Sequence, residues 1–206
     1  MARQGILIVV SGFSGAGKGT IMRELLKRYE QYALSVSATT RAPREGEEEG
    51  KDYFFKTREA FERMIADDEL VEYACYVNHY YGTPRAYVEE TLSRGRDVIL
   101  EIEIQGALKI KERFPEALLI FVMPPSADEL KRRLVGRGTE TMEVIDKRMR
   151  RAGQEAAGIT SYDYILINDA LDQCVEEMHQ LIQAQHKRVS QNLEFIQQMK
   201  SELTDR

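Results

Sequence analysis

Cysteine, histidine and long apolar runs are scarce in this chain of 206 residues, and each scarcity excludes a class of protein. The two cysteines, Cys75 and Cys174, lie far apart in the sequence, with no CxxC spacing and no histidine partner nearby. The sequence therefore supports neither a disulfide framework nor a zinc site, and it favours two buried, reduced thiols. The three histidines, at positions 79, 179 and 186, show no ligand or nucleophile spacing, which leaves them structural or solvated.

No stretch approaches the roughly 20 apolar residues of a membrane-spanning helix, and residues 1–4 show no signal-peptide pattern. The formal net charge of -5 argues against a general nucleic-acid binder, since such proteins carry a basic surface. We therefore expect a cytoplasmic protein without membrane or nucleic-acid partners, whose oligomeric state the sequence leaves open. At 43% hydrophobic residues, the chain is long enough for one well-packed core with small inserted parts.

The most informative segment that is present is ILIVVSGFSGAGKGT, at residues 6–20. An apolar run is followed by a glycine-rich turn, whose backbone N–H groups and following helix N-terminus can bind phosphate, while Lys18 supplies a mobile charge for β- and γ-phosphates. The alternative, a glycine-rich turn with a solvated lysine, is disfavoured by the apolar strand before it and the amphipathic segment 21–29 after it. The expected nucleotide-binding residues here are Gly12, Phe13, Ser14, Gly15, Ala16, Gly17, Lys18, Gly19 and Thr20.

One position of this loop departs from the usual pattern. Gly19 stands where a serine or threonine normally contacts Mg²⁺. The metal is therefore expected to be held by phosphate oxygens and water, or partly by Thr20.

Four apolar runs alternate with helix-like segments, which predicts an α/β core with a parallel sheet covered on both faces. These runs are residues 6–10, 98–104, 118–123 and 164–167. The region between the first helix and the second run has a different pattern, with short strand candidates and one helical segment. It predicts an inserted α+β subdomain, with strands at residues 35–37, 52–56 and 70–76 and a helix at 58–67.

Thr83 and Pro84 are predicted to form the N-cap and first turn of a helix that ends at Gly95. Residues 126–158 are rich in arginine and interrupted by glycines, which indicates helices joined by a mobile turn and makes this segment a candidate lid. From residue 171 a polar helical pattern runs to the C-terminus. It is expected to pack near its start and to fray after about residue 191.

Arginines cluster in the segment SVSATTRAPREG, which contains Ser37, Arg41 and Arg44 and is stiffened by Pro43. Two guanidinium groups three residues apart could clamp one phosphate bidentately. A solvated loop with surface arginines is the alternative. The acidic run that follows is interpreted as a solvated hairpin tip and consists of Glu45, Glu47, Glu48 and Glu49.

A carboxylate and several hydroxyls gather near the end of the inserted region, at Glu72, Tyr80, Tyr81 and Thr83. A carboxylate accepts hydrogen bonds from paired N–H donors, which suits the edge of guanine better than that of adenine. The alternative is an aromatic packing cluster with one surface acid.

Glu101 and Glu103 interrupt the apolar run VILEIEIQ, and strand alternation would put both on one face. A buried unpaired carboxylate is costly, so we expect them to face a ligand crevice at the carboxyl end of the sheet. Glu101 could bind a Mg²⁺-bound water or pair with an arginine.

Three more arginines lie in KRRLVGRGTETMEVIDKRM, and glycines flank the middle one. Flexible glycines suit a cation that swings onto a transferring phosphoryl group, whereas the alternative is a basic helix face. The three are Arg133, Arg137 and Arg148.

Seven segments together resemble guanylate kinases in order and spacing, up to about residue 187. They are SGFSGAGKGT, SVSATTRAPREGEEEGKDYFF, LVEYACYVNHYYGT, VILEIEIQGA, IFVMPPS, LKRRLVGRGTET and YILIND. The resemblance implies a P-loop nucleoside monophosphate kinase core with a parallel sheet, an inserted α+β GMP-binding subdomain and a helical lid. It further implies an enzyme that converts ATP and GMP to ADP and GDP with Mg²⁺, and dGMP is an expected second acceptor.

The resemblance also assigns roles to residues. Those expected to read guanine are Ser37, Glu72, Thr83 and Glu103, and those expected to hold the GMP phosphate are Arg41, Arg44, Tyr53 and Tyr81. Those expected to neutralise the transferring group are Lys18, Arg133, Arg137 and Arg148, with Arg41 also counted as catalytic. Asn168 is expected near the adenine of ATP. As protein oxygens near the metal, only Thr20 and Glu101 are candidates.

The implied division treats residues 1–206 as one domain with several parts. The core comprises 1–34, 84–125 and 159–190, the GMP-binding insert 35–83, the lid 126–158 and the polar C-terminal helix or tail 191–206. Two departures from the family pattern stand out. The loop ends in GKGT, as in adenylate kinases, and Glu101 and Glu103 replace the aspartates that many members carry.

Three other functions stay open at this point. Another nucleoside monophosphate kinase is favoured by the GKGT ending but disfavoured by Ser37, Glu72 and Glu103. A guanylate-kinase-like module that binds phosphopeptides would be expected to have a degraded phosphate loop, whereas Lys18 and the glycines are intact. An ATPase switch without an acceptor is the third.

Overall fold

The computed structural model describes residues 4–76, 78–136, 138 and 141–204, and its strands form two separate sheets. The larger has five parallel strands in the order β2-β7-β1-β8-β9. These strands are β1 (Leu7–Gly12), β2 (Tyr32–Leu34), β7 (Asp97–Glu101), β8 (Leu118–Met123) and β9 (Tyr164–Ile167). The predicted α/β class with a parallel sheet is confirmed.

Both faces of this sheet are covered by helices, because successive residues of its central strand point to opposite sides. On one face, Ile8 and Val10 pack with buried residues of α1 (Lys18–Arg28) and α7 (Leu171–Gln185). On the other face, Leu7 and Val9 pack with α3 (Arg85–Ser93) and α4 (Ile104–Arg113). A strand buried on both faces has to be apolar throughout, which explains why residues 6–10 are all apolar.

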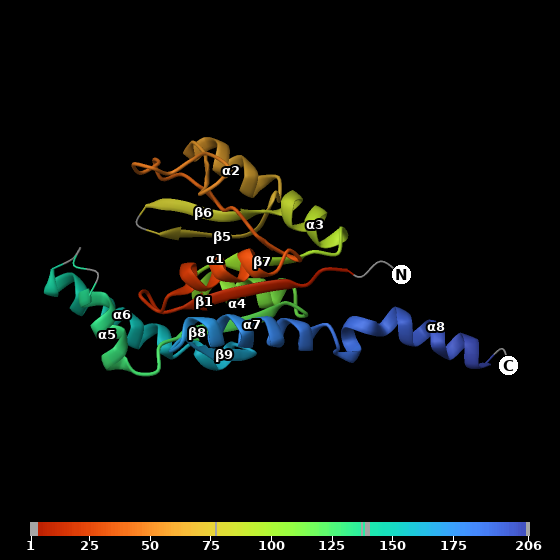
Figure 1. Ribbon diagram of the computed structural model, residues 1–206. Coiled ribbons are helices and arrows are strands. Elements are labelled where there is room, and N and C mark those ends of the chain that lie inside the picture. The colour runs from red at the N-terminus through yellow and green to blue at the C-terminus, as the bar shows by residue number, and fades with distance from the viewer. Residues whose placement is uncertain (1–3, 77, 137, 139–140, 205–206) are drawn as a thin grey trace.

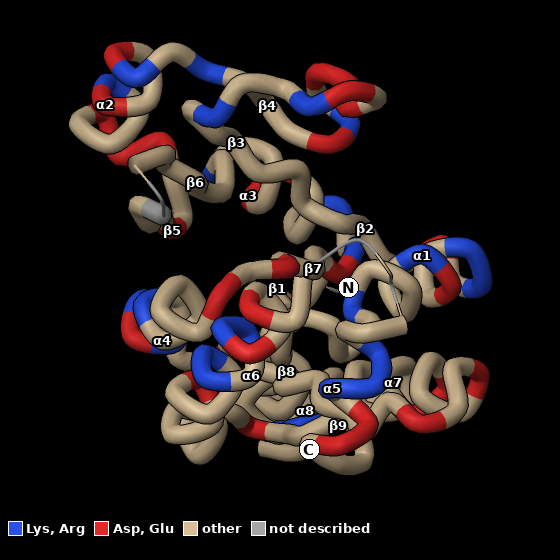
Figure 2. Tube along the Cα trace, turned by 90° about the vertical axis from the view of Figure 1, so that its left-hand side faces the viewer, with Lys and Arg blue, Asp and Glu red and all other residues tan. Residues whose placement is uncertain are grey.

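The smaller sheet has the order β4-β3-β6-β5, with one parallel pair and two antiparallel pairs. Its elements are β3 (Ala38–Thr39), β4 (Phe54–Phe55), α2 (Arg58–Ala66), β5 (Leu70–Tyr76) and β6 (His79–Pro84). Phe61 of α2 is fully buried and stacks on Tyr80, giving this sheet a small core of its own. Figures 1 and 2 show it as a layer above the parallel sheet.

The remaining helices lie at the two ends of the parallel sheet (Figure 1). At one end are α5 (Ala127–Gly136) and α6 (Met142–Ala156), followed by a short 3-10 turn, η1 (Ile159–Ser161). At the other end, η2 (Val189–Asn192) leads into α8 (Leu193–Thr204), which extends away from the body of the molecule. No helix in the described part of the chain is long and apolar enough to cross a membrane.

Two predictions about the inserted region are wrong in detail. Residues 35–37 form no strand but connect β2, which pairs with β7 in the larger sheet, to β3 in the smaller one. Thr83 does not cap a helix, because it lies inside β6 and Pro84 occupies the N-cap of α3. The Thr83 hydroxyl instead donates a hydrogen bond to the carboxylate of Glu72, 2.9 Å away.

The C-terminus and one cysteine also differ from expectation. The chain does not fray after residue 191, since α8 continues to Thr204, although none of its described side chains is buried. The Asn192 side chain, just before α8, ties η2 to the end of α7. It donates to the carbonyls of His186 and Arg188, at 2.8 and 2.7 Å. Cys174 is buried, and burial raises the pKa of its thiol to about 12, whereas Cys75 is exposed.

Because α8 buries no described side chain, deleting residues 193–206 should change the free energy of unfolding by less than about 0.5 kcal/mol. Ile182→Ala on α7 is the comparison, since Ile182 is fully buried and its truncation should cost about 2–5 kcal/mol. Urea unfolding followed by circular dichroism measures both. A truncation as costly as Ile182→Ala would show that α8 is part of the cooperative fold.

Candidate functional site

The phosphate loop joins β1 to α1, and its glycines are set by backbone geometry and by packing. Gly17 is the N-cap of α1 with φ +93°, and a Cβ there would lie 2.4 Å from the Asn168 side-chain nitrogen. Only glycine combines this conformation with so close a neighbour. At Gly19, by contrast, an added Cβ meets nothing within 4 Å. The first N–H groups of α1 have no acceptor within the helix, so they and the helix dipole suit an anion.

Lys18 lies against its own loop. Its Nζ donates to the Gly12 carbonyl at 2.8 Å and, more weakly, to that of Phe13 at 3.4 Å. Glu101 ends the neighbouring strand β7, paired with Val10 of β1. The Glu101 side chain is exposed, yet partial enclosure by the protein raises its pKa while the charge of Lys18 lowers it. An ammonium and a carboxylate therefore flank the loop.

The prediction that Glu101 and Glu103 share one face of a strand is wrong. Strand β7 ends at Glu101, and Glu103 is the N-cap of α4. The chain turns at Ile102, whose carbonyl accepts a 2.7 Å hydrogen bond from the Ser11 hydroxyl. The Glu103 carboxylate instead pairs with Arg151 of α6, with both oxygens 3.0 Å from Nη2. Nothing in the spacing of the sequence pointed to Arg151, because this contact joins residues 48 positions apart.

Arg133 and Asn168 lie together beside the phosphate loop. The Asn168 side chain is buried and donates to the Ala16 carbonyl at 2.8 Å, while Arg133 donates to the Asn168 carbonyl at 2.8 Å. Arg133 also donates to Glu129 at 2.6 Å. Hydrogen bonds from Arg132 and then Arg133 lower the pKa of Glu129 to about 2, so this acid stays ionised near neutral pH.

The structure describes one of the other two arginines of this segment. Arg148 lies on α6 and is half-buried. Arg137 lies outside the described residues, so its expected role stays a prediction.

The smaller sheet brings Arg41, Tyr53 and Tyr81 together. The Arg41 guanidinium lies 5.3 Å from the centre of the Tyr53 ring, and the rings of Tyr53 and Tyr81 are 6.1 Å apart. The interpretation of the acidic run as a solvated tip is wrong for Glu47. Both oxygens of Glu47 bind Arg41, at 2.8 and 2.9 Å, and one also accepts from the backbone N–H of Arg44 at 2.8 Å.

This pairing ties two of the expected phosphate-binding residues, Arg41 and Arg44, to one carboxylate, that of Glu47. The hydrogen bond from Arg41 contributes most to lowering the pKa of Glu47, and the backbone N–H of Arg44 adds to it. The side chain of Arg44 is exposed. Ser37 is half-buried just before β3, and its carbonyl accepts from the N–H of Phe54 at 2.9 Å.

Glu72 is the buried acid of the site, with 8% of its surface exposed. Besides the hydrogen bond from Thr83, it faces Gly106 of α4, where an added Cβ would lie 3.0 Å from Glu72 Oε2. Burial raises the pKa of Glu72 to about 7, against smaller lowering effects of Thr83 and of the charge of Lys109. Tyr80, by contrast, packs on Phe61, so this part of the predicted cluster is aromatic packing.

Comparisons with known proteins agree with this arrangement. The family model described as guanylate kinase matches residues 4–185. A guanylate kinase of Halalkalibacterium halodurans is 52% identical over 95% of this chain and 96% of its own length. One of Caldanaerobacter subterraneus is 49% identical over 97% of both chains. The crystal structure of guanylate kinase from Anaplasma phagocytophilum superimposes with a TM-score of 0.73 and 33% identity, over 90% of this chain and 88% of that one. A phosphate loop, a separate small sheet with a buried acid, and relatives alike over nearly their full length lead to one conclusion: the chain belongs to the guanylate kinase family.

Proposed function

We propose that this chain transfers the γ-phosphoryl group of ATP to GMP, giving ADP and GDP, with the residues described above carrying out both recognition and transfer. The observation that carries the proposal is a buried carboxylate in the same small sheet as an arginine and two tyrosines. A phosphate loop alone is common to many nucleotide-binding proteins. A second site with a base-reading acid and a phosphate-binding cluster implies a nucleoside monophosphate as the acceptor.

Guanine recognition is assigned to Glu72, with Thr83 beside it. Guanine presents two adjacent N–H donors along one edge, and an ionised carboxylate can accept both, whereas adenine presents a ring acceptor there. The Thr83 hydroxyl holds one Glu72 oxygen, which fixes the orientation of the group. Ser37 and Glu103 are proposed as further contacts to the base, and Glu103 would then exchange Arg151 for the nucleotide.

The phosphate of GMP is assigned to Arg41, Arg44, Tyr53 and Tyr81. A phosphate monoester has its second pKa near 6, so at neutral pH it is largely a dianion and requires no general base. The residues have instead to hold two polyanions in line and offset their repulsion. Bound GMP would compete with Glu47 for the guanidinium of Arg41.

ATP is assigned to the phosphate loop, with Lys18 and Arg133 offsetting the charge of the transferring group and Asn168 near the adenine. Lys18 would exchange the Gly12 carbonyl for phosphate oxygens, since the ammonium already lies against the loop. Arg148 and Arg137 are proposed to act with them from the lid. Together these cations would bind the transferring phosphoryl group more tightly as its charge is redistributed.

The donor set fits Mg²⁺ held mainly by phosphate and water. Among the described residues, no group of three or more histidine, cysteine, aspartate or glutamate side chains could hold a metal ion. Magnesium prefers oxygen ligands and keeps several of its waters, so an exposed Glu101 carboxylate and the Thr20 hydroxyl suffice as protein oxygens. When bound with ATP, the ion supplies neutralisation of phosphate charge.

The proposed parts are a core of residues 1–34, 84–125 and 159–190, a GMP-binding insert of 35–83 and a lid of 126–158. The separate small sheet supports the insert as a unit, and the contact of Arg151 with Glu103 joins the lid segment to the core. Closure of both over the nucleotides would exclude water from the transfer. A cytoplasmic location, where ATP and GMP are present, and acceptance of dGMP complete the proposal.

Replacing Lys18 with alanine should lower turnover with GMP and ATP by orders of magnitude, because the variant loses the charge nearest the β- and γ-phosphates. Lys27→Ala is the control, since Lys27 is exposed in the last turn of the same helix. Mass-resolved product formation with GMP, dGMP, AMP, UMP and CMP measures both variants and the unchanged protein. Comparable turnover in Lys18→Ala, or no preference of the unchanged protein for guanine nucleotides, would contradict the proposal. Tight GMP binding without transfer would favour the phosphopeptide module.

The KM for GMP should fall as pH rises from 6 to 8, because Glu72, with a pKa of about 7, accepts both guanine N–H groups only when ionised. Glu72→Gln should have a higher KM for GMP and lose this dependence, while the KM for ATP changes little. Glu69→Gln, an exposed acid beside the same strand, is the control. Initial rates at saturating ATP provide the measurement. Parallel pH profiles for the unchanged protein and Glu72→Gln would rule out this role.

The raised pKa of Glu72 also makes the stability of the protein depend on pH. The pKa of the side-chain carboxyl is 4.5 in an ordinary glutamate and about 7 for Glu72 in the folded protein. Between these two values, the carboxyl is more protonated in the folded protein than in the unfolded chain. Its contribution to stability is therefore present below pH 4.5 and lost as the pH rises through 7. Relative to Glu72→Gln, the unchanged protein should become less stable across this window, which thermal unfolding at several pH values measures.

A further inference from the structure

The strand that carries Glu72 is irregularly paired just where Glu72 lies. In the β5–β6 register, Leu70 pairs with Pro84, and pairing resumes only at Tyr73 with Gly82. Such a bulge leaves backbone groups of the bulged strand without ladder partners. Pro84 also has no N–H group to donate. The position of Glu72 is thus not fixed by regular pairing with β6, and other contacts have to fix it.

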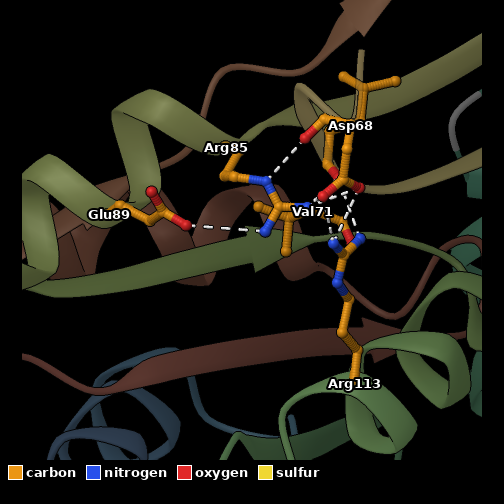
Figure 3. Close-up of polar contacts among 6 residues, drawn as sticks. Asp68, Val71, Arg85, Glu89 and Arg113 are labelled. Atoms are coloured by element: carbon orange, nitrogen blue, oxygen red, sulfur yellow. Dashed lines mark hydrogen bonds and ion pairs between the residues drawn. The ribbon is translucent and has the colours of Figure 1, made fainter. Parts of the chain in front are cut away.

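Two arginines donate to this part of the strand from outside the sheet. Arg85, at the start of α3, donates to the Leu70 carbonyl at 3.1 Å. Arg113, at the end of α4, donates to the carbonyls of Leu70 and Val71 at longer distances of 3.3 and 3.5 Å. Figure 3 shows the two side chains converging on this segment from different helices. They supply donors where the ladder is interrupted.

A single carboxylate holds both arginines in place. Asp68 Oδ1 lies 2.9 Å from Nη2 of Arg85, and the two Asp68 oxygens lie 2.8 and 2.9 Å from Nη2 of Arg113 (Figure 3). The hydrogen bond from Arg113 contributes most to lowering the pKa of Asp68, and the charge of Arg85 adds to it. We call these three residues the clamp.

The backbone at Asp68 argues that its side chain is needed. Asp68 follows the C-cap of α2 and has φ +54°, a left-handed conformation that glycine usually occupies at this position. A residue with a side chain adopts this conformation at an energetic cost, which is smaller for aspartate than for most residues. The carboxylate that binds two arginines is the visible compensation for that cost.

Helix α4 contacts the Glu72 strand on both sides of Glu72 itself. Arg113 donates to the Leu70 carbonyl, before Glu72 in the strand, and Lys109 donates to the Tyr73 carbonyl, after it, at 3.2 Å. Between them, Gly106 leaves room for the Glu72 carboxylate. Residues 106 and 113 lie two helical turns apart, on one face. The same helix starts at Glu103, the other acid proposed to contact guanine. One rigid element can therefore set the positions of both acids.

We infer that Arg113, held by Asp68, is a positioning residue for GMP: it fastens the start of β5 to α4 and thereby sets where the Glu72 carboxylate meets guanine. This inference rests on the role proposed above for Glu72. A misplacement of about 1 Å in such a group can cost up to a hundredfold in rate. Loss of the clamp should therefore weaken recognition of GMP and leave the proposed ATP site, in the loop between β1 and α1, unchanged.

The first test compares Arg113→Gln with Lys111→Gln, a matched control on the same helix. Lys111 also pairs with a carboxylate, Asp163 at 2.9 Å, and donates to the Ala117 carbonyl at 2.8 Å, but it ties α4 to the core. Arg113→Gln should raise the KM for GMP about tenfold, with kcat and the KM for ATP within about twofold of the unchanged protein. Lys111→Gln should leave both KM values unchanged even where it lowers the thermal unfolding midpoint.

Asp68→Gly separates positioning from stability. Glycine relieves the left-handed backbone but removes the carboxylate, so the KM for GMP should rise as in Arg113→Gln whatever happens to the unfolding midpoint. A purely structural role predicts instead that the KM for GMP follows the unfolding midpoint across all three variants. That correlation, or a KM for GMP within twofold of the unchanged protein in Arg113→Gln, would overturn the inference.

A double variant shows whether Arg113 acts through Glu72. The slope of rate against subsaturating GMP should fall in Arg113→Gln but change little when the same substitution is added to Glu72→Gln. A full additional fall in the double variant would overturn the inference. The single variant Glu72→Gln tests the proposed function separately, because an unaltered preference for GMP there would refute guanine recognition by Glu72 whatever Arg113 does.

Discussion

The site depends on one costly feature, a carboxylate buried where the small sheet meets helix α4. Glu72 is 8% exposed, and burial raises its pKa to about 7. Near neutral pH, its carboxyl group is therefore protonated about as often as it is ionised. Thr83 and Gly106 define the space that it occupies, and the clamp fixes its strand. In the proposed complex, a ligand edge with two N–H donors would compensate the buried charge, so the carboxylate that is costly in the free site would gain most from the matching base.

The arginines follow a complementary rule, since several that would meet phosphate are already bound to glutamates. Arg41 binds Glu47 and Arg133 binds Glu129, and Arg151, which is not assigned to phosphate, likewise binds Glu103. Internal carboxylates hold these guanidinium groups in position and keep like charges from accumulating without partners. A nucleotide entering the site would exchange one anion for another, so that little reorganisation is needed to offset the repulsion between two polyanions.

The sequence predicted those features whose cause is local. Strand β8 coincides with its predicted apolar run, because a strand buried in a parallel sheet has to be apolar throughout. Strand β9 also coincides with its predicted run, although most of its residues are exposed. The prediction that Glu101 and Glu103 share one strand face was wrong, because the chain turns from strand into helix between them. A hydrogen bond from Ser11 to the Ile102 carbonyl, 91 residues away, accompanies this turn. Arg113 and Asp68 lie 45 residues apart, and their contact had only one local signal, an aspartate where a helix ends and glycine is usual.

The pKa of the Glu72 carboxyl, measured by carbon-13 NMR on the labelled protein with and without GMP, tests the central claim most directly. The account predicts a value near 7 in the free protein and a value well below that when GMP is bound, because two N–H donors then stabilise the ionised form. An ordinary glutamate pKa that GMP leaves unchanged would contradict it, and would show that Glu72 neither carries the cost of burial nor contacts the base.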